Sequence, residues 1–459
     1  MHHTSRVPEK EQQPDGDRPG LFWNRVYEWK LQSRWSQILF LAVFAVPGLV
    51  LISQTGRIVL AQNLSDSFNP QSIRRAIHLD PANPDPHFEL GKILLLTGDP
   101  AQQLAAEQEF HVALAINPNS AAYWSGLGTA CYTTGDQACA DGAFAHAQHL
   151  APSNPQFAWQ AAINDVVSNQ PQAAVRELKT FLRLQPDGLT QSFQLLTRGF
   201  DTPELVWRDL LGDASDVHRQ MKFLEFLAAG NRVEAADGFW RDLASKKKPV
   251  SISEVSPYVD QLLAGGHYTE AASVWTYATS SNTSTYQAIL SEPNLVFNGG
   301  FEQQPLNAGF DWHHAQQPYV DLSFSDAGAK SGAHALRADF TVPQNVEYEL
   351  AYQFVPVAPS QTYELSAFFK TQDLTSDSGP RLRVLDPRCQ ACLDTATEGR
   401  TGTSDWRRVS TQFSTGPTTD VVRLSIWRPR SRTYPTEITG QLWLDDVSLV
   451  PVGQSTAKK

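Results

Sequence analysis

The sequence predicts a multidomain protein of the α plus β class, with a transmembrane helix, an α-solenoid of helical hairpins and a C-terminal β-sandwich. Three observations predict this order. Residues 38–52 form an apolar run near the N-terminus. Four similar helix endings follow, at prolines that lie 37, 34 and 34 residues apart. From residue 294 onward apolar and polar residues alternate in short segments that Gly, Pro and Asp separate, as they do in sheet proteins.

Length and charge limit the number of domains and the kinds of partner that this chain can have. At 459 residues the chain is long enough for two or three domains. Its formal net charge of −11 argues against nucleic acid as a main partner, because phosphate binding needs a basic face. The hydrophobic share of 41% is ordinary for folded protein.

The N-terminal region is predicted to anchor the chain in a membrane. Residues 1–34 form a polar, disordered and then basic tail, and residues 35–56 are long and apolar enough to cross a bilayer. Arg25, Lys30 and Arg34 precede the span, whereas only Arg57 follows it closely. The positive-inside rule therefore places the N-terminus in the cytoplasm and the rest outside. A cleaved signal sequence is the alternative, with Ala61 near a cleavage-like site.

The clearest repeat lies at residues 117–152. Its small, apolar and helix-ending residues are Trp124, Leu127, Gly128, Gly135, Ala140, Phe144, Ala147 and Pro152. In order and spacing they resemble a tetratricopeptide repeat (TPR), and this resemblance implies a helical hairpin. Equivalent helix endings occur at Pro81, Pro118 and Pro186, and 34 residues is the TPR period.

The predicted repeat array extends over residues 66–280. Beyond Pro186 the pattern weakens: residues 188–213 suggest an irregular helical pair, and degenerate repeats begin near Leu227 and Leu263. Three or more stacked repeats suffice to bury a continuous core.

The resemblance implies that the first helix of each repeat lines a concave groove for protein partners. The candidate groove residues are Phe88, Lys92, Tyr132, Trp159 and Ile163. The groove lacks the Lys, Arg and Asn set with which some family members clamp a C-terminal carboxylate, so an apolar or extended segment is the expected partner. Alternatively, Phe88 and Trp159 pack against neighbouring helices.

The four cysteines form two close pairs, Cys131 with Cys139 and Cys389 with Cys392. A zinc site would need a second ligand pair at suitable spacing, which is missing. If the chain lies outside the cytosol, two local disulfides are the better interpretation.

The C-terminal module is predicted at residues 294–452, between a linker at 281–293 and a tail at 453–459. Strands are expected at 348–355, 362–370, 381–385, 407–414, 421–427 and 442–450. The module opens with NLVFNGGFE, has SGAHALR in between and closes with LWLDDVSL. These segments resemble the jelly-roll carbohydrate-binding modules of bacterial cellulases and xylanases. The resemblance implies that the first and last strands lie together.

The same resemblance implies a glycan site and a structural calcium ion, the only cofactor expected. Exposed aromatic rings would stack against sugars, and the candidates are Trp312, Tyr319, Trp427 and Tyr434. Calcium would involve Glu302 with Asp445 or Asp446. The alternatives are that each aromatic belongs to the core and that the two aspartates form a turn.

No catalytic motif is present in the sequence. Glu302 and Asp311 could serve as the acid and the nucleophile of a glycosidase, although modules of this type are normally non-catalytic. We therefore expect a non-enzymatic adaptor of the bacterial inner membrane, with most of the chain in the periplasm. Its repeats are expected to bind protein partners and its jelly-roll module to bind glycan, in the assembly or export of a cell-surface polysaccharide. A scaffold of an envelope complex without sugar binding is the second hypothesis, and a glycan-active enzyme is the third.

Overall fold

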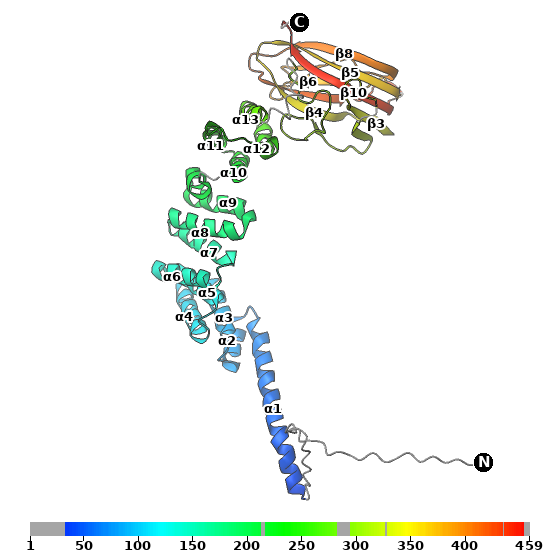
Figure 1. Cartoon of the computed structure of the whole chain (residues 1–459). Helices are drawn as coiled ribbons and strands as arrows, with labels where there is room; N and C mark the ends of the chain where they lie inside the picture. The colour runs from blue at the N-terminus through cyan, green and yellow to red at the C-terminus, as the bar shows by residue number, and fades with distance from the viewer. Residues whose placement is uncertain (1–32, 213–215, 282–293, 326–327, 435, 454–459) are drawn as a thin grey trace, which may run out of the picture. The chain divides into compact units, whose positions relative to one another are not determined.

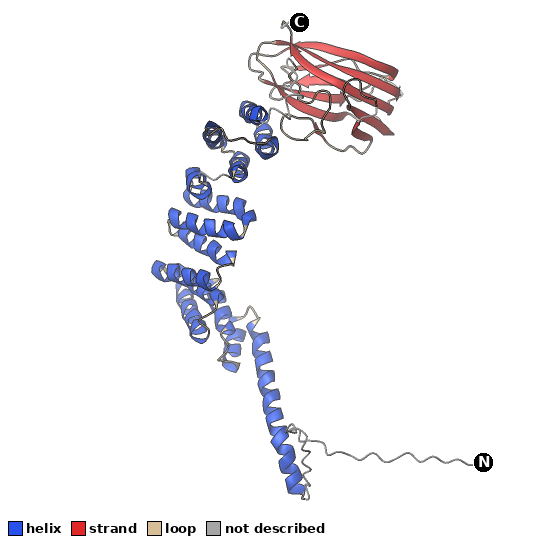
Figure 2. Cartoon of the chain, in the orientation of Figure 1, coloured by secondary structure: helices blue, strands red, loops and turns tan. Residues whose placement is uncertain are grey.

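The computed structural model describes residues 33–212, 216–281, 294–325, 328–434 and 436–453 (Figure 1). Helices occupy the described chain up to residue 281, and strands follow from residue 313 (Figure 2). Two compact units, Met1–Gly135 and Asp136–Lys459, are described separately. Most of the predicted tail (residues 1–32), most of the linker (282–293) and residues 454–459 lie outside the described residues.

The first unit is helical. Its helices are α1 (Arg34–Ser65), α2 (Pro70–Leu79), α3 (Asp85–Leu95), α4 (Pro100–Ile116) and α5 (Ala121–Thr134). Asn69, Asp99 and Ser120 precede α2, α4 and α5, and each side chain accepts a hydrogen bond from a backbone N–H of the first turn. Such caps satisfy donors that have no partner within the helix, so they fix where each helix begins.

Helix α1 contains the predicted span and continues beyond it. Within the described chain it is the one helix long and apolar enough to cross a membrane, and its composition also suits a signal sequence. The helix runs on past residue 56, where Ala61 is fully buried and α1 packs against α2. Arg57 donates from Nη2 to the Leu79 carbonyl at 2.8 Å. The end of α1 therefore belongs to the first helical hairpin.

Small residues bring α3, α4 and α5 together around Phe110. A Cβ atom added at Gly91 would lie 2.8 Å from the Phe110 ring, and one at Gly126 would lie 2.6 Å from it. Both distances are closer than real Cβ contacts. Neither position has room for a side chain. Gly91 occupies the position that Gly128 has in the next repeat, so its contact with Phe110 is a packing reason for a small residue there.

The helices of the second unit are α6 (Gln137–Leu150), α7 (Pro155–Val167), α8 (Pro171–Leu184), η2 (Pro186–Gly188), α9 (Leu189–Phe200), η3 (Leu205–Leu211), α10 (Val217–Ala229), α11 (Val233–Ser245), α12 (Ile252–Ala264) and α13 (Tyr268–Ser281). The irregular stretch predicted after Pro186 contains α9 and η3, a π-helix. One core of buried residues runs from Ala158 to Ala278, as stacked hairpins require.

The strands are β1 (His313–His314), β2 (Val320–Ser325), β3 (Ala335–Gln344), β4 (Tyr348–Pro356), β5 (Thr362–Leu374), β6 (Arg381–Leu385), β7 (Asp394–Ala396), β8 (Gly402–Ser414), β9 (Val421–Arg428) and β10 (Ile438–Pro451). They form two antiparallel sheets, sheet A in the order β1-β4-β9-β6-β7 and sheet B in the order β2-β3-β10-β5-β8. Consecutive strands mostly alternate between sheets, as in a jelly roll. The predicted fold class is confirmed.

The beginning of the module lies along its last strand. Leu295 donates its backbone N–H to the Leu449 carbonyl at 2.9 Å, and Val447 donates to the Gly299 carbonyl at 2.8 Å. A Cβ atom at Gly299 would lie 2.1 Å from the Val447 oxygen, so this approach requires glycine. Strands β1, β2, β3 and β7 were not among those predicted; two of them are only two or three residues long.

Candidate functional site

In the first unit, a predicted groove residue contacts the array itself. Phe88 is half-buried on α3, and its ring centroid lies 5.8 Å from that of Phe110 and 5.0 Å from that of Tyr123. Lys92 lies over the same ring at 5.0 Å. Phe88 therefore packs between helices, as the alternative interpretation expected, and Lys92 covers part of the remaining surface.

In the second unit, α7 offers an apolar stripe. Trp159 is half-buried and its ring lies 5.1 Å from that of Phe181. Ile163 is 37% exposed and Val167, one turn later, is 59% exposed. Residues four apart share one face of a helix, so these two side chains form an apolar stripe. The remaining candidate, Tyr132, is half-buried on α5 in the other unit.

The structure does not bring the four predicted sugar platforms together. Trp312 has no exposed surface, and its indole N–H donates to the Asn298 carbonyl at 3.1 Å, so it is a core residue. Tyr319 is half-buried against the sandwich core, whereas Tyr434 is 91% exposed. Trp427 is half-buried on β9 of sheet A. Of the four, Trp427 alone lies in sheet A.

Cationic side chains cover the aromatic rings of the outer face of sheet A. The Arg383 guanidinium lies over the Trp427 ring at 4.5 Å, and that of Arg423 lies over the Tyr352 ring at 4.0 Å. His313 on β1 is stacked on Tyr352, with ring centroids 4.9 Å apart. Cation–π contacts of this kind hold the arginines in place. A sugar could stack on Trp427 only if Arg383 moved aside.

Carboxylates complete this face and a hollow opens beside it. Glu347 accepts from the Trp427 indole N–H at 2.8 Å, and Glu349 forms an ion pair with Arg423. The hollow has a volume of about 410 Å³, and its lining includes both glutamates, Tyr352 and His313. Such a set of donors and acceptors suits a polar, hydroxyl-rich ligand better than an apolar one.

Tyr352 and Arg423 were missed by the sequence reasoning. Alternation along β4 and β9 was visible, because Tyr352 lies two residues before Phe354 and Arg423 four before Trp427. The pairing of β4 with β9 was not visible, since some 70 residues separate the two strands and the register pairs Glu349 with Trp427. Cross-strand neighbours define this face, so only the pairing reveals it.

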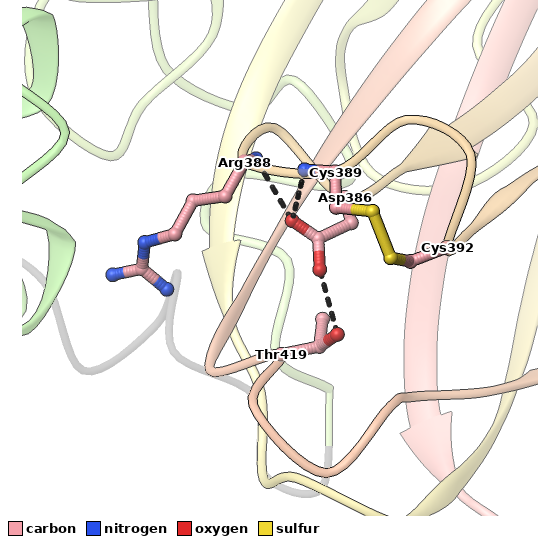
Figure 3. Close-up of a disulfide and its surroundings, with 5 residues drawn as sticks. All are labelled: Asp386, Arg388, Cys389, Cys392 and Thr419. Carbon is pink, nitrogen blue, oxygen red and sulfur yellow. Dashed lines mark hydrogen bonds between the residues drawn. A yellow bond between two sulfur atoms is a disulfide. The ribbon is translucent and has the colours of Figure 1, made fainter.

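The disulfide between Cys389 and Cys392 closes a turn between β6 and β7 (Figure 3). Inside the turn, Asp386 accepts hydrogen bonds from the backbone N–H groups of Arg388 at 2.8 Å and Cys389 at 3.2 Å. Its other oxygen accepts from the Thr419 hydroxyl at 2.6 Å. The predicted disulfide between Cys389 and Cys392 is thus confirmed. Figure 3 shows the Arg388 guanidinium extending away from the turn.

Arg388 joins the sandwich to the end of the helical array. Its guanidinium lies 4.8 Å from the centroid of Tyr268 at the start of α13, and it forms an ion pair with Asp420. Thr269, the next residue of α13, donates its hydroxyl to Asp420 at 2.9 Å. A turn fixed by a disulfide thus presents one arginine to both an aromatic ring and a carboxylate.

Apolar contacts also form part of this joint. Trp275 on α13 has its ring centroid 5.5 Å from that of Phe297 and 6.0 Å from that of Phe310. Gly309 has φ +59°, and its N–H donates to Asp260 on α12 at 2.7 Å. Phe297 and Phe310 belong to the core cluster of the array. The array and sandwich therefore share a packed interface.

The other cysteine pair, Cys131 and Cys139, contains no free thiol, since both residues are disulfide-bonded. Cys131 lies late on α5 and Cys139 early on α6, as predicted. Their pairing with each other stays a prediction.

The carboxylates predicted to hold calcium accept hydrogen bonds from the SGAHALR segment. Asp445 is fully buried and accepts from the N–H groups of Lys330 at 2.9 Å and Ser331 at 3.1 Å. Glu302 accepts from the N–H of Ala333 at 3.0 Å. The Asp446 carboxylate accepts from the Ser331 hydroxyl at 2.6 Å. Within the described residues, no group of three or more His, Cys, Asp or Glu side chains is placed to hold a metal ion. The calcium ion stays a prediction.

The carboxylate pair considered for catalysis has structural partners. Asp311 is 1% exposed and accepts from the N–H groups of Leu306 at 2.8 Å and Trp312 at 2.7 Å. Burial raises the pKa of Asp311 to about 6, and these N–H groups oppose the rise. Glu302 is engaged by the segment after Ser331. Both carboxylates therefore accept hydrogen bonds that hold loops in place.

No family model matches the chain, and no curated protein matches it. Several solved structures resemble parts of it. A family 16 carbohydrate-binding module is 19% identical over 34% of this chain and 99% of that chain, with a TM-score of 0.25. The MamA protein is 17% identical over 39% of this chain and 96% of that chain, with a TM-score of 0.30.

The enzymatically active domain of tailspike protein 4 from bacteriophage CBA120 is also similar. It is 13% identical over 35% of this chain, with a TM-score of 0.27, and the match spans 21% of that chain. At identities below 20% and TM-scores of 0.30 or lower, these three likenesses say nothing of this chain's ligand or activity.

Proposed function

We propose that this chain is a membrane-anchored, non-enzymatic adaptor. Helix α1 holds it in the bacterial inner membrane with the N-terminus in the cytoplasm, and the repeat array and sandwich lie in the periplasm. The array binds protein partners, and the outer face of sheet A binds glycan. Such an adaptor serves assembly or export of a cell-surface polysaccharide.

The continuity of α1 with the array is the observation that carries the proposal. A helix that can cross a membrane also buries Ala61 against α2 and donates from Arg57 to Leu79. A cleaved signal sequence leaves the protein and has no such contacts to maintain. The disulfide at Cys389 and Cys392 supports an oxidising compartment.

Protein binding is supported by the apolar stripe on α7, since Ile163 and Val167 have substantial exposed surface. Apolar anchors four residues apart are the pattern with which helical grooves take up extended or helical segments. Helix α8 of the same repeat carries exposed Lys179, which provides a matched control position.

Glycan binding is supported by the hollow beside sheet A and by the hydrogen-bonding groups around it. One observation favours the second candidate function, a scaffold without sugar binding: the rings of Trp427 and Tyr352 are covered by Arg383 and Arg423. Stacking on sugars needs an open ring face. The glycan-binding adaptor and the scaffold therefore differ in whether sheet A binds a sugar.

Topology is tested by labelling intact cells whose outer membrane is permeable to a membrane-impermeant maleimide. Lys179→Cys introduces an exposed thiol on α8, and the unsubstituted chain gives the background. We expect labelling without lysis of the inner membrane. Labelling that appears only after lysis would place the array in the cytoplasm and overturn the proposal.

Protein binding is tested with a photo-crosslinking amino acid at position 167 or 179 of the full chain in cells. We expect a discrete crosslinked product from position 167, none from 179, and loss of the product when Ile163→Asp is added. Equal products from both positions would contradict a specific groove.

Glycan binding is tested by titrating polysaccharides into the full chain in detergent, with and without calcium. Glu347→Gln and Glu349→Gln together should weaken binding at least tenfold, because each removes a charged acceptor beside the hollow. Absence of binding to any polysaccharide would leave the scaffold as the function. Released sugar products would show an enzyme instead.

A further inference from the structure

A second hollow lies in the array, between α6, α7 and α8. This α6–α8 hollow has a volume of about 200 Å³, and its polar lining includes Asp141 and Gln148 of α6, Asn164 and Asp165 of α7, and Glu177 of α8. It belongs to neither the α7 stripe nor the sandwich.

The hollow exists because one repeat departs from the seam pattern. Three residues after the small residue of the first helix, the two preceding repeats have buried apolar side chains, Leu94 after Gly91 and Cys131 after Gly128. The third repeat has Asp165 after Ala162 at this position, and Asp165 is 7% exposed. A short carboxylate thus replaces an apolar side chain that would fill the seam, which costs stability unless something compensates.

Asn164 provides an independent sign of a ligand. It is 3% exposed, lines the hollow and donates from Nδ2 to Asp141 at 3.2 Å. The amide must keep this orientation, because its oxygen would repel the carboxylate. Its Oδ1 has no hydrogen-bond partner. A buried acceptor without a donor is costly in an empty site, and a donor that enters the hollow would satisfy it.

The charges around Asp165 are mostly negative. Asp141 comes from α6, and Glu177 and Arg176 come from α8. Glu177 accepts from the Gln148 amide at 2.6 Å. Within the described chain these carboxylates do not form a group placed to hold a metal ion. An extended cation with several N–H donors can reach acceptors that a single metal ion cannot bridge.

We propose that the α6–α8 hollow binds an organic cation, the ammonium or guanidinium group of a basic side chain or a small amine, through Asp165, Glu177 and Oδ1 of Asn164. The cation donates hydrogen bonds to the buried acceptors and neutralises the excess negative charge. The inference rests on the array alone and holds whether or not sheet A binds glycan.

Binding should depend on pH in a defined direction. Burial, with the nearby charges of Glu177 and Asp141, raises the pKa of Asp165 to about 7, while Arg176 opposes the rise. A cation binds the ionised carboxylate, so it releases the proton that Asp165 holds below this pH. Affinity therefore rises with pH up to about 7 and then levels off.

The test uses the full chain in detergent and ligand-observed nuclear magnetic resonance. The probes are N-acetyl-arginine methylamide and N-acetyl-lysine methylamide for a side chain, and putrescine for a free amine. We expect saturable binding at pH 8 that weakens about tenfold by pH 6. Tighter binding of the amino-acid amides would assign a partner's side chain, and tighter binding of putrescine a free amine.

Asp165→Asn and Glu177→Gln should each weaken binding about tenfold or more, because each removes a charge-assisted hydrogen bond but keeps the side-chain shape. Asp209→Asn is the matched control, an exposed aspartate on η3 outside the hollow. Circular dichroism checks that each variant folds. The proposal would be overturned if none of the three probes showed saturable binding, or if Asp165→Asn and Asp209→Asn bound the probes with equal affinity. Competition by millimolar calcium or magnesium that abolishes amine binding would also overturn it.

Discussion

At the scale of single residues, the structure shows what surrounds two residues whose types matter for stability, Asp165 and Gly299. Asp165 occupies a seam position and is buried. Its burial and the nearby carboxylates of Asp141 and Glu177 oppose its ionisation. Gly299 lies where the first segment of the sandwich passes β10, too close for any side chain. In both cases the effect of a substitution follows from what surrounds the residue.

Asp165→Asn should change how stability depends on pH. The pKa of Asp165 is raised to about 7 in the folded chain. Between about pH 4 and pH 7 the folded chain therefore holds a proton that the unfolded chain releases, so the free energy of unfolding falls as pH rises. The substitution removes this fall, so the free energy of unfolding of Asp165→Asn relative to the unsubstituted chain should be about 2–3 kcal/mol larger at pH 8 than at pH 5. Thermal unfolding midpoints at the two pH values measure it; identical pH dependence in both chains would contradict it.

Gly299→Ala should destabilise the sandwich. The new Cβ atom would meet the Val447 carbonyl oxygen at 2.1 Å, which forces the two backbones apart. We expect a loss of about 1–3 kcal/mol, as for other overpacked sites. Gly142→Ala is the control: it lies within α6 with nothing within 4 Å, and alanine should stabilise the helix by about 0.5–1 kcal/mol. Calorimetry compares the two, and a harmless Gly299→Ala would show that the segments separate easily.

At the scale of elements, α13 has two roles. It completes the last hairpin of the array with α12, and it contacts the sandwich through Tyr268, Thr269 and Trp275. Trp240 on α11 is equally buried but packs on Tyr277 within the array. The two tryptophans therefore separate the stability of the joint from that of the array.

Trp275→Ala should uncouple the sandwich from the array. Removing this buried ring leaves a cavity against Phe297 and Phe310, at a cost of about 3–5 kcal/mol. In calorimetry of the full chain we expect the sandwich and the array to unfold in separate transitions. Trp240→Ala should lower the array transition by a similar cost without this separation. One unchanged cooperative transition in Trp275→Ala would show that the polar contacts alone maintain the joint.

At the scale of the whole molecule, the boundary between array and sandwich differs from a flexible connection between independent domains. Phe297, Phe310 and Val421 of the sandwich are buried in the core cluster of the array. Arg388 and Asp420 add charged contacts to α13. Apolar packing of this kind opposes free relative motion of two domains.

A fragment of residues 294–459 should therefore be less stable than the same sandwich within residues 136–459. Cutting off the array exposes three buried apolar side chains and leaves Arg388 without Tyr268. We expect a lower unfolding midpoint for the sandwich in the short fragment and a tendency to aggregate. Equal midpoints and equal solubility would contradict a shared core. Experiments on glycan binding should use the full chain for this reason.

Periodicity and end signals were enough to predict the order of helix array and sandwich. The repeat residues around Trp124, the prolines that end each repeat, and the first and last segments of the sandwich are local patterns, and local sequence preferences determine them. The Cys389–Cys392 disulfide was predicted for the same reason, because its two residues are close in the chain. Trp312 was named as a sugar platform although it lies in the core, because the local sequence around an aromatic residue does not show whether its ring is buried or exposed.

The sequence by itself determined the architecture: an apolar helix near the N-terminus, a repeat of fixed period and an alternating C-terminal module. Only the tertiary structure decided the sites. The arginines over Trp427 and Tyr352, the joint at Trp275 and the α6–α8 hollow all bring together residues from separate elements. Periodicity reports which face of an element is buried, whereas a site depends on which faces meet, and that depends on strand pairing and helix packing across the whole chain.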